Sequence, residues 1–162
     1  MLVPCEIPPA MPLADDVIEL RLIRVLGPDN VEARPPEAQF LSRVPECRFA
    51  IHRRSDGQRV GRIHLRVTDD QNILGAVGHS GYAVDEPHRR KGYAVRAIRL
   101  IVSLARHYGI APLWVLTEPD NIPSCRAVER AGFKLIDQIA TKPEALRLGH
   151  GPQVCRYAID RP

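Results

Sequence analysis

Residues suited to holding a phosphate group lie together at one point of the chain, between Arg89 and Ala94. Three cations, Arg89, Arg90 and Lys91, come directly before Gly92, and the small Ala94 follows two residues later. Guanidinium and ammonium groups form charge-assisted bonds with phosphate oxygens, and a glycine lets a bulky group approach the main chain closely. This spacing therefore predicts a cradle for a diphosphate.

A strand and a helix flank this cradle and are expected to position it. The strand is predicted over 77–84, Pro87 ends it, and an amphipathic helix follows from about Tyr93 to Tyr108, with Gly109 as its stop. The first N–H groups of a helix have no main-chain acceptor, and together with the helix dipole they attract anions. The cradle should therefore combine side-chain and main-chain donors.

Two motifs in this order resemble those of the GNAT N-acetyltransferases. The pattern Arg89-x-x-Gly92-x-Ala94 after a strand is similar to the family's acetyl-CoA pyrophosphate loop. A second block, from Asn121 to Phe133, resembles the family's later helix, with its asparagine, its glutamate followed by a base and its closing Gly-Phe pair. The resemblance covers about residues 61–159 and is nearest to the branch of ribosomal-protein N-terminal acetyltransferases.

The resemblance implies an α/β GNAT fold, with a mixed, mostly antiparallel and splayed sheet flanked by helices. It also implies acetyl transfer from acetyl-CoA, as cosubstrate, to a primary amine by direct attack in a ternary complex. The amine can belong to a protein N-terminus or to a small molecule. The residues implied to bind acetyl-CoA, including the strand main chain that would face the thioester carbonyl, are Tyr82, Ala83, Val84, Arg89, Arg90, Lys91, Gly92, Tyr93, Ala94, Asn121 and Ser124.

Removal of a proton from the acceptor amine is the harder chemical step, because a lysine-like amine has a pKa of about 10.4 and is mostly protonated at neutral pH. Several family members use a glutamate on the cradle strand, but Gly78 stands at that place here. His79 is a candidate general base, although a lone histidine on a strand is more often structural. Glu118 is a second candidate and suits a capping or surface position equally well.

Protonation of the leaving thiolate has one candidate. Many relatives use a tyrosine seven residues after the asparagine, where this chain has Val128. Ser124 matches the branch in which a serine can approach the CoA sulfur, and it is equally an ordinary residue for the first turn of a helix. Asn121 has the same two interpretations, a contact to the cofactor or a helix N-cap, and the two are compatible.

Composition narrows the class of protein. The 162 residues fit a single N-acetyltransferase domain over 1–162, with a Pro-rich arm at 1–16. No apolar run is long enough to cross a membrane and the first residues do not resemble a leader, which favours the cytoplasm. The four cysteines form no C-x-x-C pair, so we expect reduced thiols and no metal site. A homodimer is left open.

The net charge of +4 is concentrated near the cradle, because six Lys or Arg residues and one acid lie between Glu86 and Gly109. This distribution favours a small polyanion over nucleic acid, which needs a spread of cations and stacking aromatics. A nucleic-acid-binding module remains a distant alternative. A closer one is a non-catalytic acyl-CoA-binding or sensor protein on the same fold.

The remaining elements follow from apolar periodicity and turn residues. We expect only short helical potential over 37–44, where the family commonly has two helices, a polar loop over 68–75, and a helix from Asn121 that ends at Gly132. A long connection is expected over 140–153, within a closing hairpin. Strands are predicted over 17–26, 49–53, 59–67, 113–117, 133–139 and 154–159.

Overall fold

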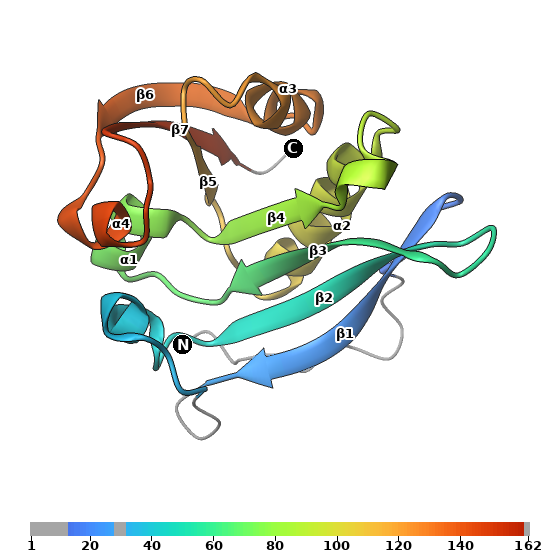
Figure 1. The fold of residues 1–162 in the computed structure, drawn as a ribbon, viewed down its shortest axis with the longest axis horizontal. Coiled ribbons are helices and arrows are strands. Elements are labelled where there is room, and N and C mark those ends of the chain that lie inside the picture. Colours follow the sequence, from blue (N-terminus) through green and yellow to red (C-terminus); the bar gives the residue numbers. More distant parts are fainter. Residues whose placement is uncertain (1–12, 28–31, 161–162) are drawn as a thin grey trace.

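The computed structural model describes residues 13–27 and 32–160, which form two antiparallel sheets flanked by helices (Figure 1). The first sheet has the order β1-β2-β3-β4 and the second has the order β5-β7-β6. The strands are β1 (Ile18–Leu26), β2 (Glu46–Arg53), β3 (Arg59–Arg66), β4 (Ser80–Val84), β5 (Leu113–Thr117), β6 (Lys134–Ala140) and β7 (Gln153–Ile159).

Two longer helices and several short ones join these strands. Helix α2 (Tyr93–His107) follows β4, and α3 (Ile122–Arg130) follows β5. The short helices α1 (Gln71–Val77) and α4 (Pro143–Arg147) lie beside each other at one end of the molecule (Figure 1). Two 3₁₀ turns complete the set, η1 (Pro36–Leu41) and η2 (Glu86–His88).

The main core lies between the sheets and the two longer helices. Alternate residues of β3, such as Ile63 and Leu65, face Ile98 and Ile101 of α2, and all four are almost fully buried. Val128 of α3 joins the same core. Apolar residues at spacings of three and four on α2 and at spacings of two on β3 therefore build one interior, as their periodicity predicts.

Strands β4 and β5 belong to different sheets and meet at the start of β4. There the main-chain N–H of His79 donates to the carbonyl of Trp114 at 2.8 Å. The expectation of an α/β fold with a splayed, mostly antiparallel sheet and flanking helices is confirmed. Beyond this contact β4 and β5 are not paired, and this divergence, called the splay below, leaves one side of β4 without a partner strand.

Several local expectations were wrong. Residues 71–75, expected to lie in a polar loop, belong to α1, because Asp70 accepts a hydrogen bond from the N–H of Asn72 and caps the helix. Ile73 then packs against Leu41 and Val44 in a second, smaller core. The strand expected from residue 77 begins only at Ser80, since α1 occupies its first position.

The cysteines also differ in part from expectation, whereas the long connection between β6 and β7 is present and contains helix α4. Cys47 is disulfide-bonded, so the expectation of a reduced thiol is wrong there, whereas Cys125 and Cys155 are free. The prediction for Cys5 and most of the predicted arm lie outside the described residues.

Candidate active site

The predicted cradle is an open helix N-terminus preceded by a turn with two left-handed residues. Arg90 has φ of 64° and Gly92, the N-cap residue of α2, has φ of 80°. No side chain caps this helix, and its first intrahelical bond runs from the N–H of Arg96 to the carbonyl of Gly92. The N–H groups of the first turn are therefore available to an anion.

The side chains of the cradle divide into two groups. Arg90 and Lys91 are exposed. Arg89 is tied to the preceding strand, because its Nε donates to the carbonyl of Val84 at 2.9 Å. Tyr93 is buried and its hydroxyl lies 3.4 Å from a guanidinium nitrogen of Arg53, so only its main chain can face an anion. The cradle thus offers two free cations beside a helix start.

The main chain of β4 presents unpaired donors to the splay. The N–H of Arg66 donates to the carbonyl of His79, and the N–H of Asp85 donates to the carbonyl of Val60. Main-chain groups alternate in direction along an antiparallel strand, so the N–H and carbonyl groups of every second residue from His79 to Asp85 point toward β3. Tyr82 and Val84 lie between these residues, so their N–H groups point away from β3 and into the splay. The donors for a thioester carbonyl were predicted at this place.

A hydroxyl pair bridges β4 and α3 on the core side of this splay. The Tyr82 hydroxyl lies 2.8 Å from Oγ of Ser124 and 3.3 Å from the carbonyl oxygen of the same residue. Asn121 accepts a hydrogen bond from the N–H of Ser124 at 3.3 Å, so it is the N-cap of α3. Burial raises the pKa of Tyr82, which keeps its hydroxyl protonated. Sequence reasoning assigned Tyr82 a main-chain role only.

His79 is held by both ring nitrogens. Its Nδ1 accepts from the N–H of Trp114 at 2.9 Å, and its Nε2 lies 3.1 Å from the carbonyl of Thr68, to which it can only donate. The residue is 2% exposed, and burial lowers the pKa of His79 to about 4. This neutral tautomer joins β4 to β5, a geometry that favours the structural alternative over a general base.

Gly78 and Glu118 are also in close contact with neighbouring segments. Gly78 has φ of 69°, and a Cβ at this position would lie 3.0 Å from the carbonyl of Trp114 and 3.1 Å from Cδ1 of Leu116. The Glu118 carboxylate accepts from the N–H of Gly151 at 3.0 Å and lies 3.4 Å from Nδ1 of His150. It therefore anchors the connection between β6 and β7.

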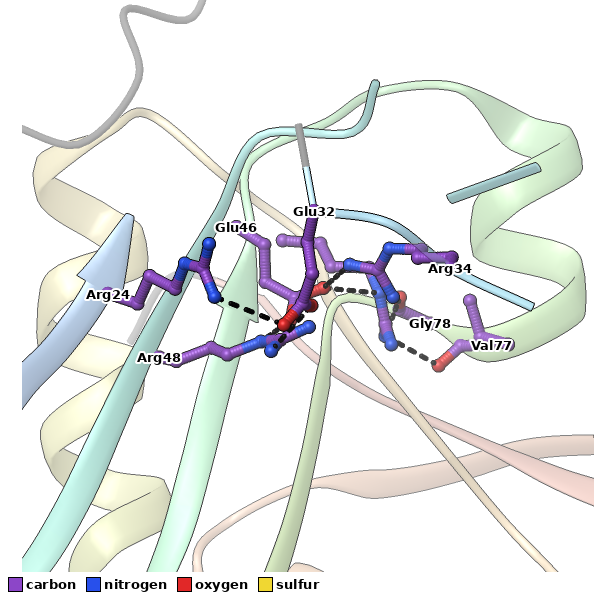
Figure 2. Close-up of polar contacts among 8 residues, drawn as sticks. Arg24, Glu32, Arg34, Glu46, Arg48, Val77 and Gly78 are labelled. Atoms are coloured by element: carbon purple, nitrogen blue, oxygen red, sulfur yellow. Dashed lines mark hydrogen bonds and ion pairs between the residues drawn. The ribbon is translucent and has the colours of Figure 1, made fainter. Parts of the chain in front are cut away.

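A network of arginines and glutamates covers the end of the first sheet near Gly78 (Figure 2). Glu46, 3% exposed, accepts from Nε of Arg48 at 2.7 Å and forms longer ion pairs with Arg34 and Arg66. Arg66 also donates to the carbonyl of Gly78 at 3.3 Å. Burial would raise the pKa of Glu46, but His64, Arg66 and Arg48 together hold it below its ordinary value. No pattern in the sequence indicated this network.

Residues 27–134 match the model of the acetyltransferase (GNAT) domain. No curated protein matches. Among the described residues, no group of three or more metal-ligating side chains occurs, and no helix of that part is long and apolar enough to cross a bilayer.

Solved structures of acetyltransferases share the fold. A putative ribosomal-protein-serine acetyltransferase from Vibrio cholerae is 14% identical at a TM-score of 0.63, covering 96% of this chain and 100% of that one. The ribosomal-protein-S5-alanine acetyltransferase from Vibrio fischeri is 14% identical at 0.56, covering 71% and 61%. The self-immunity acetyltransferase MccE, solved with acetyl-CoA and AMP, is 18% identical at 0.58, covering 72% and 61%. The chain thus spans about three fifths of the last two.

Proposed function

The chain belongs to the GNAT family of acetyltransferases, and from this premise we propose that it transfers acetyl from acetyl-CoA to a primary amine. The acceptor is a protein N-terminus or a small amine, and transfer is direct within a ternary complex. MccE, which has the same fold, was solved with acetyl-CoA, which supports this choice of cosubstrate.

One observation carries the proposal: a single segment, from Tyr82 to Gly92, joins outward-facing N–H groups of β4 to the uncapped start of α2. The uncapped start of α2 lies at one end of it, and the N–H groups of Tyr82 and Val84 lie at the other. The bond from Arg89 to the carbonyl of Val84 fixes the two ends relative to each other. A long cosubstrate with a diphosphate at one end and a thioester at the other suits this arrangement.

The chemistry follows from these positions. The thioester carbonyl would accept from the N–H of Tyr82 or Val84, which stabilises the negative charge that develops on its oxygen. The amine nitrogen bonds to the carbonyl carbon, the carbon–sulfur bond breaks, and the sulfur takes a proton from the pair of hydroxyls on Tyr82 and Ser124. The amine gives up its own proton to water.

Neither candidate base is free to take a proton from the acceptor amine, and this restricts which amines can react. His79 has no free nitrogen and Glu118 holds a loop, so a strongly basic amine would stay protonated. At pH 7.5 about a third of an α-amino group with a pKa near 7.8 is neutral, compared with about 0.1% of a lysine side chain. An α-amine is therefore the favoured acceptor.

Calorimetric titration with acetyl-CoA, beside desulfo-CoA, tests the proposal. We expect saturable binding at one site per chain, followed by release of CoA when an α-amine is added. The double variant Arg90→Glu with Gly92→Val should lose binding, with far-ultraviolet circular dichroism confirming the fold. Binding that is unchanged in this variant would exclude the cradle as the diphosphate site.

A second candidate function is a non-catalytic acyl-CoA sensor. The observation that favours it is the absence of a free base at Gly78 and His79 in the described splay. A sensor predicts acetyl-CoA binding with no turnover across a panel of α-amines and ε-amines, so the same sample distinguishes the two functions.

A further inference from the structure

We infer that the acceptor carries a carboxylate or phosphate group close to its amine, and that Arg62 binds this group. The inference rests on the proposed function and narrows its substrate class to anionic amines. It depends on three features: the side of β4 from which an amine can approach, the residues that form that side, and the balance of charge there.

The amine must approach β4 from the side opposite to the helices. Tyr82 points toward α3, where its hydroxyl meets Ser124, and it packs against the core that α2 and α3 close. The neighbouring residues on β4, Gly81 and Ala83, have the opposite orientation because side chains alternate along a strand. The open face of the first sheet therefore leads to the reacting carbon.

Two rows of cross-strand neighbours run over this face and end on β4. One row is Arg24, Arg48, His64 and Gly81, and the other is Arg21, Ala50, Arg62 and Ala83. Directly opposed side chains in an antiparallel pair have Cβ atoms about 5 Å apart. Arg62 is therefore the last cation before β4 in its row, next to Ala83 and one residue from Tyr82.

Most cations of this face contact a carboxylate, whereas the two exposed arginines of β3, Arg59 and Arg62, contact none among the described residues. Arg21 bonds to Glu19, Arg24 to Glu32, and both Arg48 and Arg66 to Glu46. The Arg62 side chain is exposed and forms no ion pair or hydrogen bond with any residue of the described ranges. Of the cations on this face without a carboxylate partner, it lies nearest along the rows to Tyr82 and the proposed thioester.

A second polar group on this face lacks a partner. Nε2 of His64 is buried and has no hydrogen-bond partner among the described residues. The ring lies against β4, since its Cε1 is 2.7 Å from where a Cβ would stand at Gly81. A neutral imidazole with an unused ring nitrogen can donate a hydrogen bond, so β3 holds a second polar group without a partner two positions from Arg62.

The chemistry of Arg62 then selects among acceptors. A guanidinium forms short bidentate bonds with carboxylate or phosphate, whereas a cationic group near the amine would be repelled. Free acidic amino acids and peptides with an acidic residue after the N-terminus both carry this chemistry. The length of an arginine side chain suits an anion in the same residue as the amine or in the next.

Matched acceptors test the inference. Three peptides would differ only at their second residue, which is aspartate, asparagine or lysine. Free asparagine and its α-amide, compared at equal concentrations of neutral amine, would represent small amines. For the peptides or for the free amino acids, we expect kcat/KM for the acidic member to exceed that for its amide by about tenfold, and the lysine peptide to be poorest. Whichever pair shows the effect identifies the source of the anion.

Variants of two arginines on β3 supply the comparison. Arg62→Gln should bring the acidic and amide acceptors to within about twofold of each other. Arg59→Gln changes another exposed arginine of β3, opposite His52, and should keep the full preference. Equal rates for both acceptors in the unaltered protein, or a preference that survives in Arg62→Gln, would overturn the inference.

Failure of the proposed function gives a different result. If acetyl-CoA does not bind, the proposed function fails. If it binds without turnover, the same peptides titrated into the protein with CoA present still measure the charge preference through their Kd. If neutral and acidic amines are acetylated alike, the proposed function stands and only the role of Arg62 is lost.

Salt-sensitive binding of duplex DNA to the same face, abolished in Arg62→Gln, would also overturn the inference.

Discussion

The hydroxyl of Tyr82 and Oγ of Ser124 lie 2.8 Å apart, so β4 and the first turn of α3 are joined by a hydrogen bond between side chains. The two residues are 42 positions apart in the chain. Ser124 keeps its place because Asn121 caps the helix, and Tyr82 keeps its proton because burial raises its pKa. The pair can therefore supply a proton where the leaving sulfur would lie.

Replacement of this pair should slow acetyl transfer without loss of cosubstrate affinity. We expect Tyr82→Phe to lower kcat by about 10²-fold, the usual scale of general acid catalysis, with little change in the Kd of acetyl-CoA. Ser124→Ala should cost little more in a Tyr82→Phe background, since the two act as one unit. Additive losses, measured by steady-state kinetics of CoA release, would show independent roles.

His79 should make stability depend on pH in mildly acidic solution. Its folded pKa is about 4, below the ordinary 6.5, so the unfolded chain binds the proton more readily. The contribution of the neutral ring is complete above pH 6.5 and is lost as pH falls toward 4, by about 3 kcal/mol in total. His79→Asn keeps an acceptor for Trp114 and does not titrate. Denaturant unfolding at several pH values should show a shallower slope in this variant.

Arg90 separates backbone strain from ligand binding. A non-glycine residue at φ of 64° costs about 1 kcal/mol, so Arg90→Gly should raise the free energy of unfolding by up to about that amount. It should also weaken acetyl-CoA binding, because a cation of the cradle is lost. Lys91→Gly is the matched control: it removes a charge at a residue without positive φ and should weaken binding with no gain in stability.

Glu46 should be far more important for stability than its neighbour Glu32. Its side chain is 3% exposed and balances Arg34, Arg48 and Arg66, whereas Glu32 is 30% exposed. Removing one partner of a buried ionic network costs about 3–5 kcal/mol, and an exposed pair costs about 0–1 kcal/mol. Chemical denaturation of Glu46→Gln and Glu32→Gln measures the difference, and similar losses would show that the network is not stabilising.

The extents of α2 and β3 and the turn before α2 could be predicted because their signals are local. Three cations before Gly92 and the apolar spacing of α2 are readable within one stretch of residues, as is the alternation in β3. Helix α1 was missed because a single turn of apolar residues after Asp70 is too short to outweigh its polar surroundings.

The partners of the site residues could not be predicted, since they come from distant parts of the chain. The role of His79 depends on Trp114, 35 positions away, and on Thr68, which lies in a different loop. The same holds for Glu46, whose ion pairs require Arg34, Arg48 and Arg66 to converge from three segments. Tertiary contact, and not local pattern, gives these residues their roles.

The close approach at Gly78 also restricts how this chain could evolve or be engineered. In relatives that carry a glutamate at this position, one side chain supplies the base, but here a Cβ would meet the carbonyl of Trp114 at 3.0 Å with the backbone at φ of 69°. A single Gly78→Glu change therefore cannot create a lysine-acetylating enzyme. β5 would have to move first, so the proposed preference for weakly basic amines follows from the backbone geometry at Gly78.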